Sequence, residues 1–187
     1  MEPFLYQIVH LYAGRARLLN EHVARLHIAS CELFGRAYRP DLKLLEGRLL
    51  REVERERYPD AVSSFVKIEL FETGEENLYG VGTSLYAGYA LRSVRPEVMT
   101  IAYDPPLETM SVASLSNHLV AQSLARTRGF DEALRVDRNG VGRSLGEGSV
   151  FGFREGVLIA PKGLPTATDT AMWEAARAAR QPAVQHP

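Results

Sequence analysis

The residues of this chain that could do chemistry are few, and its lysines are the easiest of them to follow. Lys and Arg total 22, yet only Lys43, Lys67 and Lys162 are lysines. A lysine amine can form a Schiff base with a carbonyl compound, but the long stretch between Lys67 and Lys162 contains no lysine. The sequence also has no cluster of His, Cys, Asp and Glu with metal-ligand spacing, no nucleophile elbow and no phosphate-binding glycine loop.

The elements of this lysine-free stretch can be read from its pattern. Apolar residues at helical spacing predict a helix over residues 111–128, and alternation predicts a strand over 133–137. Asn139-Gly140 predicts a tight hairpin turn, with both residues at positive φ. A second hairpin is predicted over residues 150–160.

The first half of the chain predicts a small α+β domain over residues 1–94. The expected elements are a strand Phe4–Leu11, a strand Ala16–Leu19, a helix capped by Asn20 and ended by Gly35, a helix Asp41–Tyr58, a strand Ser63–Glu72 and a strand around Leu85–Leu91. Leu42, Leu45, Leu49 and Val53 form one apolar stripe of the second helix. Residues 95–180 are expected to form a larger, β-rich domain, and residues 181–187 a disordered tail.

Two groups of motifs, in the same order and far apart, resemble one enzyme family. The first group is Tyr6–Gly14 and Asn20–Leu26, and the second is Gly129–Asp137 with Asn139-Gly140 and Phe151–Pro161. Together they are similar to the fold-type IV (class IV) pyridoxal-phosphate enzymes, which include branched-chain aminotransferases and aminodeoxychorismate lyase. The resemblance covers about residues 4–170 and implies a two-domain α+β fold, of which the last part is expected to be absent.

The resemblance implies a Schiff-base lysine just before the helix of the larger domain, but this sequence has Met110 there. Lys67, from the small domain, is the fallback candidate for the Schiff-base lysine. In the family a carboxylate keeps the pyridine nitrogen of the cofactor protonated, and the matching position is Ser144, with Ser149 in place of a nearby asparagine. Glu147 could replace that carboxylate only if its loop were remodelled.

The remaining positions concern the cofactor phosphate and the substrate. Arg25 matches the arginine that binds the phosphate in the family, and Thr168 a threonine of the second half of the phosphate site. The neighbouring family arginine is replaced by Asp169, whose charge would repel a phosphate. His10 stands where many relatives have an arginine that faces the substrate carboxylate.

Three functions follow as hypotheses. The first is a class IV aminotransferase-like pseudoenzyme that has lost pyridoxal-phosphate catalysis and holds no such cofactor, and that serves as a scaffold or binds a small anionic ligand. The second is an active aminotransferase or aminodeoxychorismate lyase, and the third a non-catalytic, homodimeric structural or regulatory subunit. A net charge of −1 gives no reason to expect nucleic acid, and without an apolar run of membrane-spanning length the protein is expected to be cytoplasmic.

Overall fold

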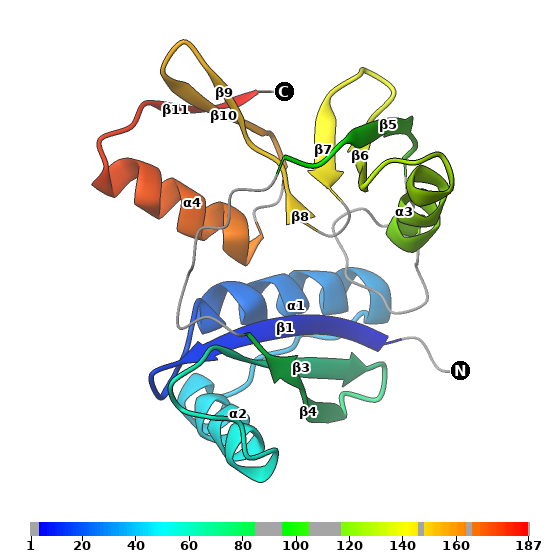
Figure 1. The fold of residues 1–187 in the computed structure, drawn as a ribbon. Coiled ribbons are helices and arrows are strands. Elements are labelled where there is room, and N and C mark those ends of the chain that lie inside the picture. Colours follow the sequence, from blue (N-terminus) through cyan, green and yellow to red (C-terminus); the bar gives the residue numbers. More distant parts are fainter. Residues whose placement is uncertain (1–3, 85–94, 105–116, 146–147, 164–165, 187) are drawn as a thin grey trace. The chain divides into compact units, whose positions relative to one another are not determined.

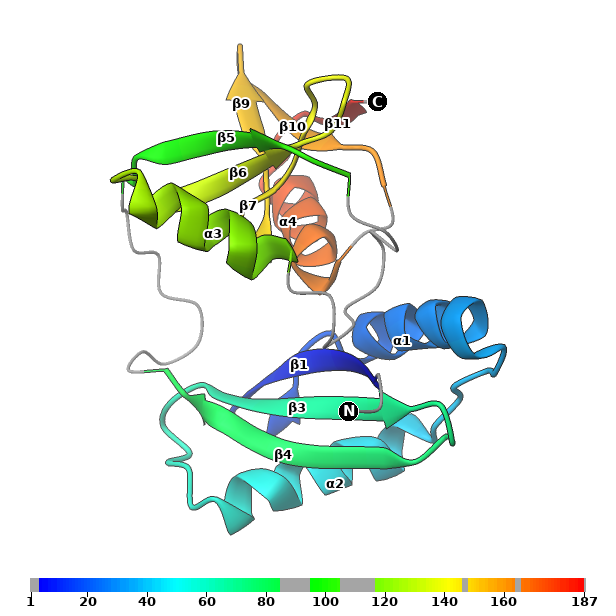
Figure 2. The same ribbon diagram turned by 90° about the vertical axis from the view of Figure 1, so that its right-hand side faces the viewer.

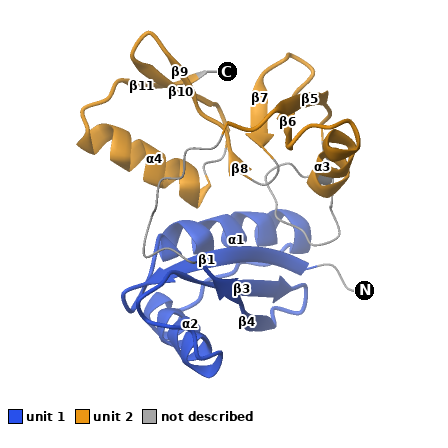
Figure 3. Ribbon diagram, in the orientation of Figure 1, with its two compact units in different colours: residues 1–92, 109–115 blue, residues 93–108, 116–187 orange. Residues whose placement is uncertain are grey.

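The structure, a computed structural model, forms two compact units. It describes residues 4–84, 95–104, 117–145, 148–163 and 166–186. Unit 1 comprises Met1–Arg92 with Thr109–Leu115, and unit 2 comprises Ser93–Glu108 with Ser116–Pro187 (Figure 3). Both units contain helices and sheets, antiparallel in unit 1 and mixed in unit 2, so the predicted α+β class is confirmed. The strand predicted around Leu85–Leu91 lies outside the described residues.

Unit 1 is built on an antiparallel sheet with the strand order β2-β1-β3-β4 (Figure 1). Its strands are β1 (Phe4–Tyr12), β2 (Arg15–Ala16), β3 (Ser64–Phe71) and β4 (Glu76–Thr83). The register of β1 and β3 sets alternate residues of both strands on the same face. One face carries the buried apolar residues, and the other carries aromatic and polar side chains.

Two helices, α1 (Leu19–Phe34) and α2 (Leu42–Arg55), cover the apolar face of this sheet (Figure 2). The predicted cap at Asn20 is wrong, because α1 already begins at Leu19 and its N-cap, Leu18, adopts a left-handed conformation. That early start also shortens the strand predicted to reach Leu19. Gly35 ends α1 as predicted, at φ 62°, a conformation that glycine adopts without strain.

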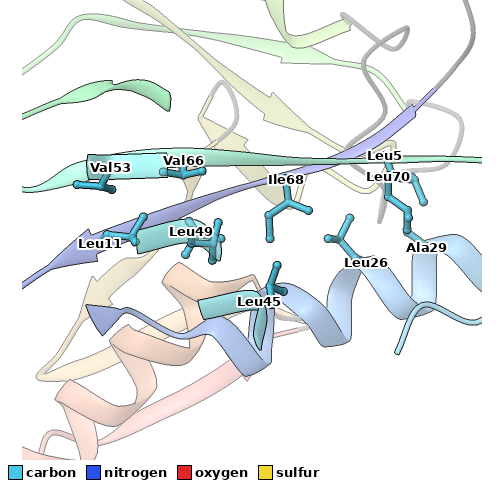
Figure 4. Close-up of a cluster of buried hydrophobic side chains, with 11 residues drawn as sticks. Leu5, Leu11, Leu26, Ala29, Leu45, Leu49, Val53, Val66, Ile68 and Leu70 are labelled. Carbon is cyan, nitrogen blue, oxygen red and sulfur yellow. The ribbon is translucent and has the colours of Figure 1, made fainter. Parts of the chain in front are cut away.

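The core of unit 1 forms where the stripes of both helices meet strands β1 and β3 (Figure 4). The helices contribute Leu26, Ala29, Leu45, Leu49 and Val53, and the strands Leu5, Val9, Leu11, Val66, Ile68 and Leu70. The stripe predicted for the second helix is therefore buried at Leu45, Leu49 and Val53, but the prediction is wrong for Leu42, which is 39% exposed at the start of α2. This close packing fixes the tilt of α1 and the register of β1, the two elements on which His10 and Arg25 lie.

Unit 2 contains a sheet with the strand order β5-β6-β7-β8 and the helix α3 (Asn117–Thr127). The strands are β5 (Val98–Ala102), β6 (Glu132–Val136), β7 (Gly142–Leu145) and β8 (Gly148–Ser149). Ala121 and Ala125 of α3 pack against Ala133 of β6. The first residues of the predicted helix, 111–116, lie outside the described residues.

The turn between β6 and β7 differs from the predicted one. Only Gly140 has positive φ, 79°, and Asn139 does not. The carboxylate of Asp137 explains the difference, because it accepts hydrogen bonds from the backbone N–H groups of Asn139 (2.8 Å) and Val141 (3.0 Å). An aspartate that binds its own turn in this way stabilises a conformation with only one left-handed residue.

The last part of unit 2 is a sheet with the strand order β11-β10-β9. Its strands are β9 (Gly152–Arg154), β10 (Val157–Pro161) and β11 (Ala183–His186). Helix α4 (Ala167–Ala178) connects β10 to β11 along the chain. The hairpin of β9 and β10 confirms the second predicted hairpin. The prediction of a disordered tail is wrong for Ala183–His186, because this segment pairs in parallel with β10 and satisfies its backbone groups there.

Candidate functional site

Lys67, the fallback for the missing Schiff-base lysine, lies on β3 and is held by neighbours of unit 1. Its Nζ donates a hydrogen bond to the hydroxyl oxygen of Tyr79 (2.9 Å) and pairs with the Glu69 carboxylate (3.0 Å). The same Nζ lies 4.7 Å from the ring centroid of Tyr6 and 5.0 Å from that of Phe4, within the range of cation–π attraction. Lys67 is therefore the centre of a small polar and aromatic cluster on the sheet.

The protonation of Lys67 works against nucleophilic chemistry. Burial by itself lowers the pKa of Lys67, but the hydrogen bonds to Tyr79 and Glu69 outweigh it and raise the pKa above its ordinary value. The amine consequently carries its proton at neutral pH, whereas Schiff-base formation needs the neutral amine. Met110, the position matched to the family lysine, lies outside the described residues, as does Glu147.

Ser144 lies on β7, at the position matched to the ring-nitrogen carboxylate, and faces an arginine. Arg135 is its direct partner across the β6–β7 ladder, and Arg135 Nε donates a long hydrogen bond, 3.4 Å, to Ser144 Oγ. The Arg135 side chain is buried, with only 6% of the residue exposed, and its guanidinium lies 5.8 Å from the ring centroid of Tyr103. A guanidinium thus stands where the resemblance implies a carboxylate.

Sequence reasoning overlooked Arg135, although the sequence carried a signal for it. A two-residue turn at Asn139-Gly140 sets Arg135 directly opposite Ser144. The observed strands have this pair, even though their register shifts by one residue between Arg135 and Val136. The family motif that contains Ser144 lies on β7, whereas Arg135 lies on the neighbouring strand β6.

The polar contacts continue from Ser144 to the start of α4. Ser149 on β8 is the cross-strand partner of Ser144, and Ser149 Oγ lies 2.9 Å from Thr166 Oγ1. Thr166 is the N-cap of α4. Its Oγ1 accepts a hydrogen bond from the Asp169 backbone N–H (3.1 Å), and the Asp169 carboxylate accepts one from the Thr166 N–H (2.7 Å). Strand pairing places Ser144 beside Ser149, and hydrogen bonds link Ser149 to Thr166 and Thr166 to Asp169. These four residues therefore form one contiguous row.

This capping box changes what the start of α4 can bind. An exposed helix N-terminus attracts phosphate, but here a carboxylate of the chain itself occupies the backbone donor of Thr166 and supplies the negative charge. Thr168 is exposed on the first turn, and no contact of its hydroxyl is among those described. The N-terminus of α4 is stabilised as a helix end and is poorly suited to a phosphate dianion.

Arg25, matched to the phosphate-binding arginine, lies on α1 of unit 1 beside His22. His22 Nδ1 is 2.9 Å from the side-chain oxygen of Gln7 on β1. Burial, helped by the positive charge of Arg25, lowers the pKa of His22 from 6.5 to about 4. His22 is therefore neutral at neutral pH, which leaves Arg25 as the positive charge of this pair.

His10 lies on β1 and is engaged within the sheet of unit 1. Its Nε2 is 2.8 Å from Ser63 Oγ, and its ring stacks on Phe65 with the centroids 5.3 Å apart. Burial lowers the pKa of His10, and the charge of Arg17 lowers it further. A neutral imidazole has no fixed positive charge, so His10 lacks the property with which an arginine holds a substrate carboxylate.

The described residues do not fit pyridoxal phosphate as an electron-sink cofactor. Lys67 is a paired cation, Ser144 faces the guanidinium of Arg135, and Asp169 occupies the helix start. Arg25, Lys67 and His10 belong to unit 1, whereas Ser144 and Thr168 belong to unit 2. Among the described residues, no group of three or more His, Cys, Asp and Glu is arranged to hold a metal ion. Within the same residues, no helix has the length and apolar character needed to cross a membrane.

Comparison with solved structures finds similarity over nearly the whole chain. A branched-chain amino acid aminotransferase of Escherichia coli is similar with a TM-score of 0.78 and 16% identity, over 98% of this chain and 68% of that one. A putative 4-amino-4-deoxychorismate lyase gives a TM-score of 0.76 and 25% identity, over 98% of this chain and 74% of that one. The putative lyase of the same name from Legionella pneumophila gives 0.76 and 13%, over 98% and 72%.

The sequence matches no model of a protein family and no curated protein. The fold is nevertheless plain from the solved structures, which are class IV aminotransferases and aminodeoxychorismate lyases. The resemblance inferred from the motifs at both ends of the chain is confirmed at the level of structure, and this chain has the class IV, or fold-type IV, aminotransferase fold.

Proposed function

We propose that this chain is a class IV aminotransferase-like scaffold without pyridoxal-phosphate catalysis, which binds a small anionic ligand in place of the cofactor. The observation that carries the proposal is the state of Lys67. It precedes a long lysine-free stretch, and its amine is protonated, paired with Glu69 and surrounded by aromatic rings. A lysine in this state is a poor nucleophile, and Met110 supplies no amine at the matched position.

Two arginines support the part of the proposal that concerns an anionic ligand. Arg25 keeps its positive charge beside a neutral His22 in unit 1, and Arg135 brings a guanidinium to Ser144 in unit 2. Guanidinium groups bind carboxylates and phosphates through paired hydrogen bonds. An active aminotransferase or lyase, the function named for the similar structures, would require Lys67 to leave its carboxylate and lose a proton.

The decisive measurement is the absorbance of the purified protein after addition of pyridoxal phosphate and then borohydride. We expect no adduct that borohydride fixes to Lys67, because Glu69 and Tyr79 hold its amine in the protonated form. A Lys67→Met variant is the matched control and is expected to give the same spectrum as the unchanged protein. A band that borohydride fixes, that mass spectrometry maps to Lys67 and that this variant lacks would overturn the proposal.

A second candidate function, the non-catalytic homodimeric subunit, is favoured by one surface. Helix α3 exposes three apolar side chains, Leu119 (53%), Val120 (68%) and Leu124 (39%), which line a shallow hollow with Ser123 and Thr127. Exposed apolar residues gathered on one helix face are typical of protein contact surfaces. Homodimerisation and the cytoplasmic location expected from the sequence stay predictions.

Val120→Asp tests the dimer through this surface. If two copies associate through α3, a carboxylate at its most exposed apolar position would have to be buried, so we expect the variant to sediment as a monomer where the unchanged protein sediments as a dimer. Arg126→Asp, also an exposed change on α3 but outside the apolar set, is the control and should leave the oligomeric state unchanged. A dimer that survives Val120→Asp would show that α3 is not its interface.

A further inference from the structure

The most unusual feature of unit 2 is a buried arginine in direct contact with Ser144. Arg135 and Ser144 are partners across β6 and β7, the Nε–Oγ distance is 3.4 Å, and Arg135 is 94% buried, since 6% of it is exposed. A guanidinium cannot be deprotonated at any pH at which a protein is folded. The charge beside Ser144 is therefore permanent.

The position of that charge is fixed by the sheet. Arg135 starts from the middle of β6, where both neighbouring strands restrict its backbone, and its guanidinium lies over the ring of Tyr103 at 5.8 Å. Burial raises the pKa of Tyr103 while the charge of Arg135 opposes that rise, which is the effect expected of a nearby cation. Buried charges interact more strongly than exposed ones because the interior screens them less.

Two other charged side chains, Arg143 and Asp169, lie near Ser144 in the chain or through its contacts, and their described hydrogen bonds go to other residues. Arg143, the preceding residue of β7, pairs with the Asp137 carboxylate at 2.6 Å and donates to the backbone oxygen of Lys162 at 2.8 Å. Asp169, at the far end of the row through Ser149, binds the backbone of Thr166. Among the described residues, Arg135 is the charged side chain whose hydrogen bond reaches Ser144 itself.

We infer that the position of Ser144 is a cationic subsite, which favours an anionic group of a small ligand, such as a carboxylate, and disfavours a protonated pyridine ring. This inference deepens the proposed function and rests on it. In the resembled family a carboxylate at this position stabilises the positive ring nitrogen. A guanidinium at the same position has the opposite sign and would repel that ring, but it attracts a carboxylate and can donate hydrogen bonds to it.

The sign and size of the field at Ser144 can be measured with a thiol in place of its hydroxyl. Ser144→Cys is nearly isosteric, and Cys31→Ser removes the one natural cysteine, which is exposed. The thiol pKa is read from the thiolate absorbance as a function of pH, first with Arg135 present and then with Arg135→Met. An opposite charge within hydrogen-bonding distance lowers a pKa by about one to three units, so the pKa should be lower by at least about one unit when Arg135 is present.

The comparison of the two proteins isolates Arg135, because burial of the thiol and Glu147 remain the same in both. Arg135→Gln replaces Arg135→Met if circular dichroism shows that the methionine variant is unfolded. As a control that keeps Arg135, Ser149→Cys in the Cys31→Ser background should have a higher thiol pKa, since Ser149 contacts Thr166 of the capping box with Asp169. Equal thiol pKa values with and without Arg135 would overturn the inference and leave the borohydride result of the proposed function unaffected.

Discussion

Leu49→Ala is expected to lower the free energy of unfolding of unit 1 by about 3 kcal/mol, the range for a buried leucine being roughly 2–5 kcal/mol. Leu49 lies on α2, and its side chain is fully buried in the core that α2 forms with β1 and β3. Removal of its three terminal carbon atoms leaves a cavity that the rigid sheet cannot close. Urea denaturation followed by far-ultraviolet circular dichroism measures the loss.

The same helix provides a matched control, Leu44→Ala. Leu44 is 68% exposed, so this substitution should change the free energy of unfolding by less than about 0.5 kcal/mol. Trp173, the single tryptophan, lies on α4 of unit 2, and its fluorescence therefore reports on that unit. Equal losses for Leu44→Ala and Leu49→Ala would contradict the core of unit 1 described above.

The second large effect is a loss of stability in weak acid that depends on His22. Its pKa is lowered from 6.5 to about 4 in the folded protein, first by burial and then by Arg25. The unfolded chain therefore binds a proton that the folded chain does not bind between these two values, and stability must fall as the pH falls through this window. At about 1.4 kcal/mol per pKa unit, the loss reaches about 3 kcal/mol.

His22→Gln separates this effect from the titration of carboxyl groups. The glutamine has no proton to gain, so the free energy of unfolding of the variant should decline less between neutral pH and about pH 4.5, by about 2 kcal/mol, than that of the unchanged protein. Identical pH profiles would show that His22 is not the group responsible. NMR titration of the His22 ring adds a functional measurement, because inorganic phosphate bound at Arg25 would offset its charge and raise the pKa of His22.

Local patterns were sufficient to predict most of the scaffold. The stripe predicted for the second helix is buried at Leu45, Leu49 and Val53, and the strand predicted over Ser63–Glu72 is present as β3. Such patterns succeed because side-chain direction follows the helical or strand period. The cap at Asn20 was not predictable in this way, since the turn after β2 and the packing of Leu19 against the core decide where α1 begins.

The candidate site depends on contacts that no single segment contains. Ser144 meets Arg135 across β6 and β7, and Ser149 of β8 meets Thr166 at the start of α4. Ala183–His186 form a strand because β10 offers them a free edge. In each case the partner residue belongs to another element of the fold.

The sequence by itself determined that this chain has no lysine between Lys67 and Lys162, that Ser144 stands at the position of a family carboxylate, and that the motifs of a class IV fold surround both. Residue identity is sufficient for such statements. Only the tertiary structure decided that Lys67 is paired with Glu69 and that Arg135 lies against Ser144. The charge of a site depends on which side chains the register and packing bring together, and here they bring a cation to the position of a carboxylate.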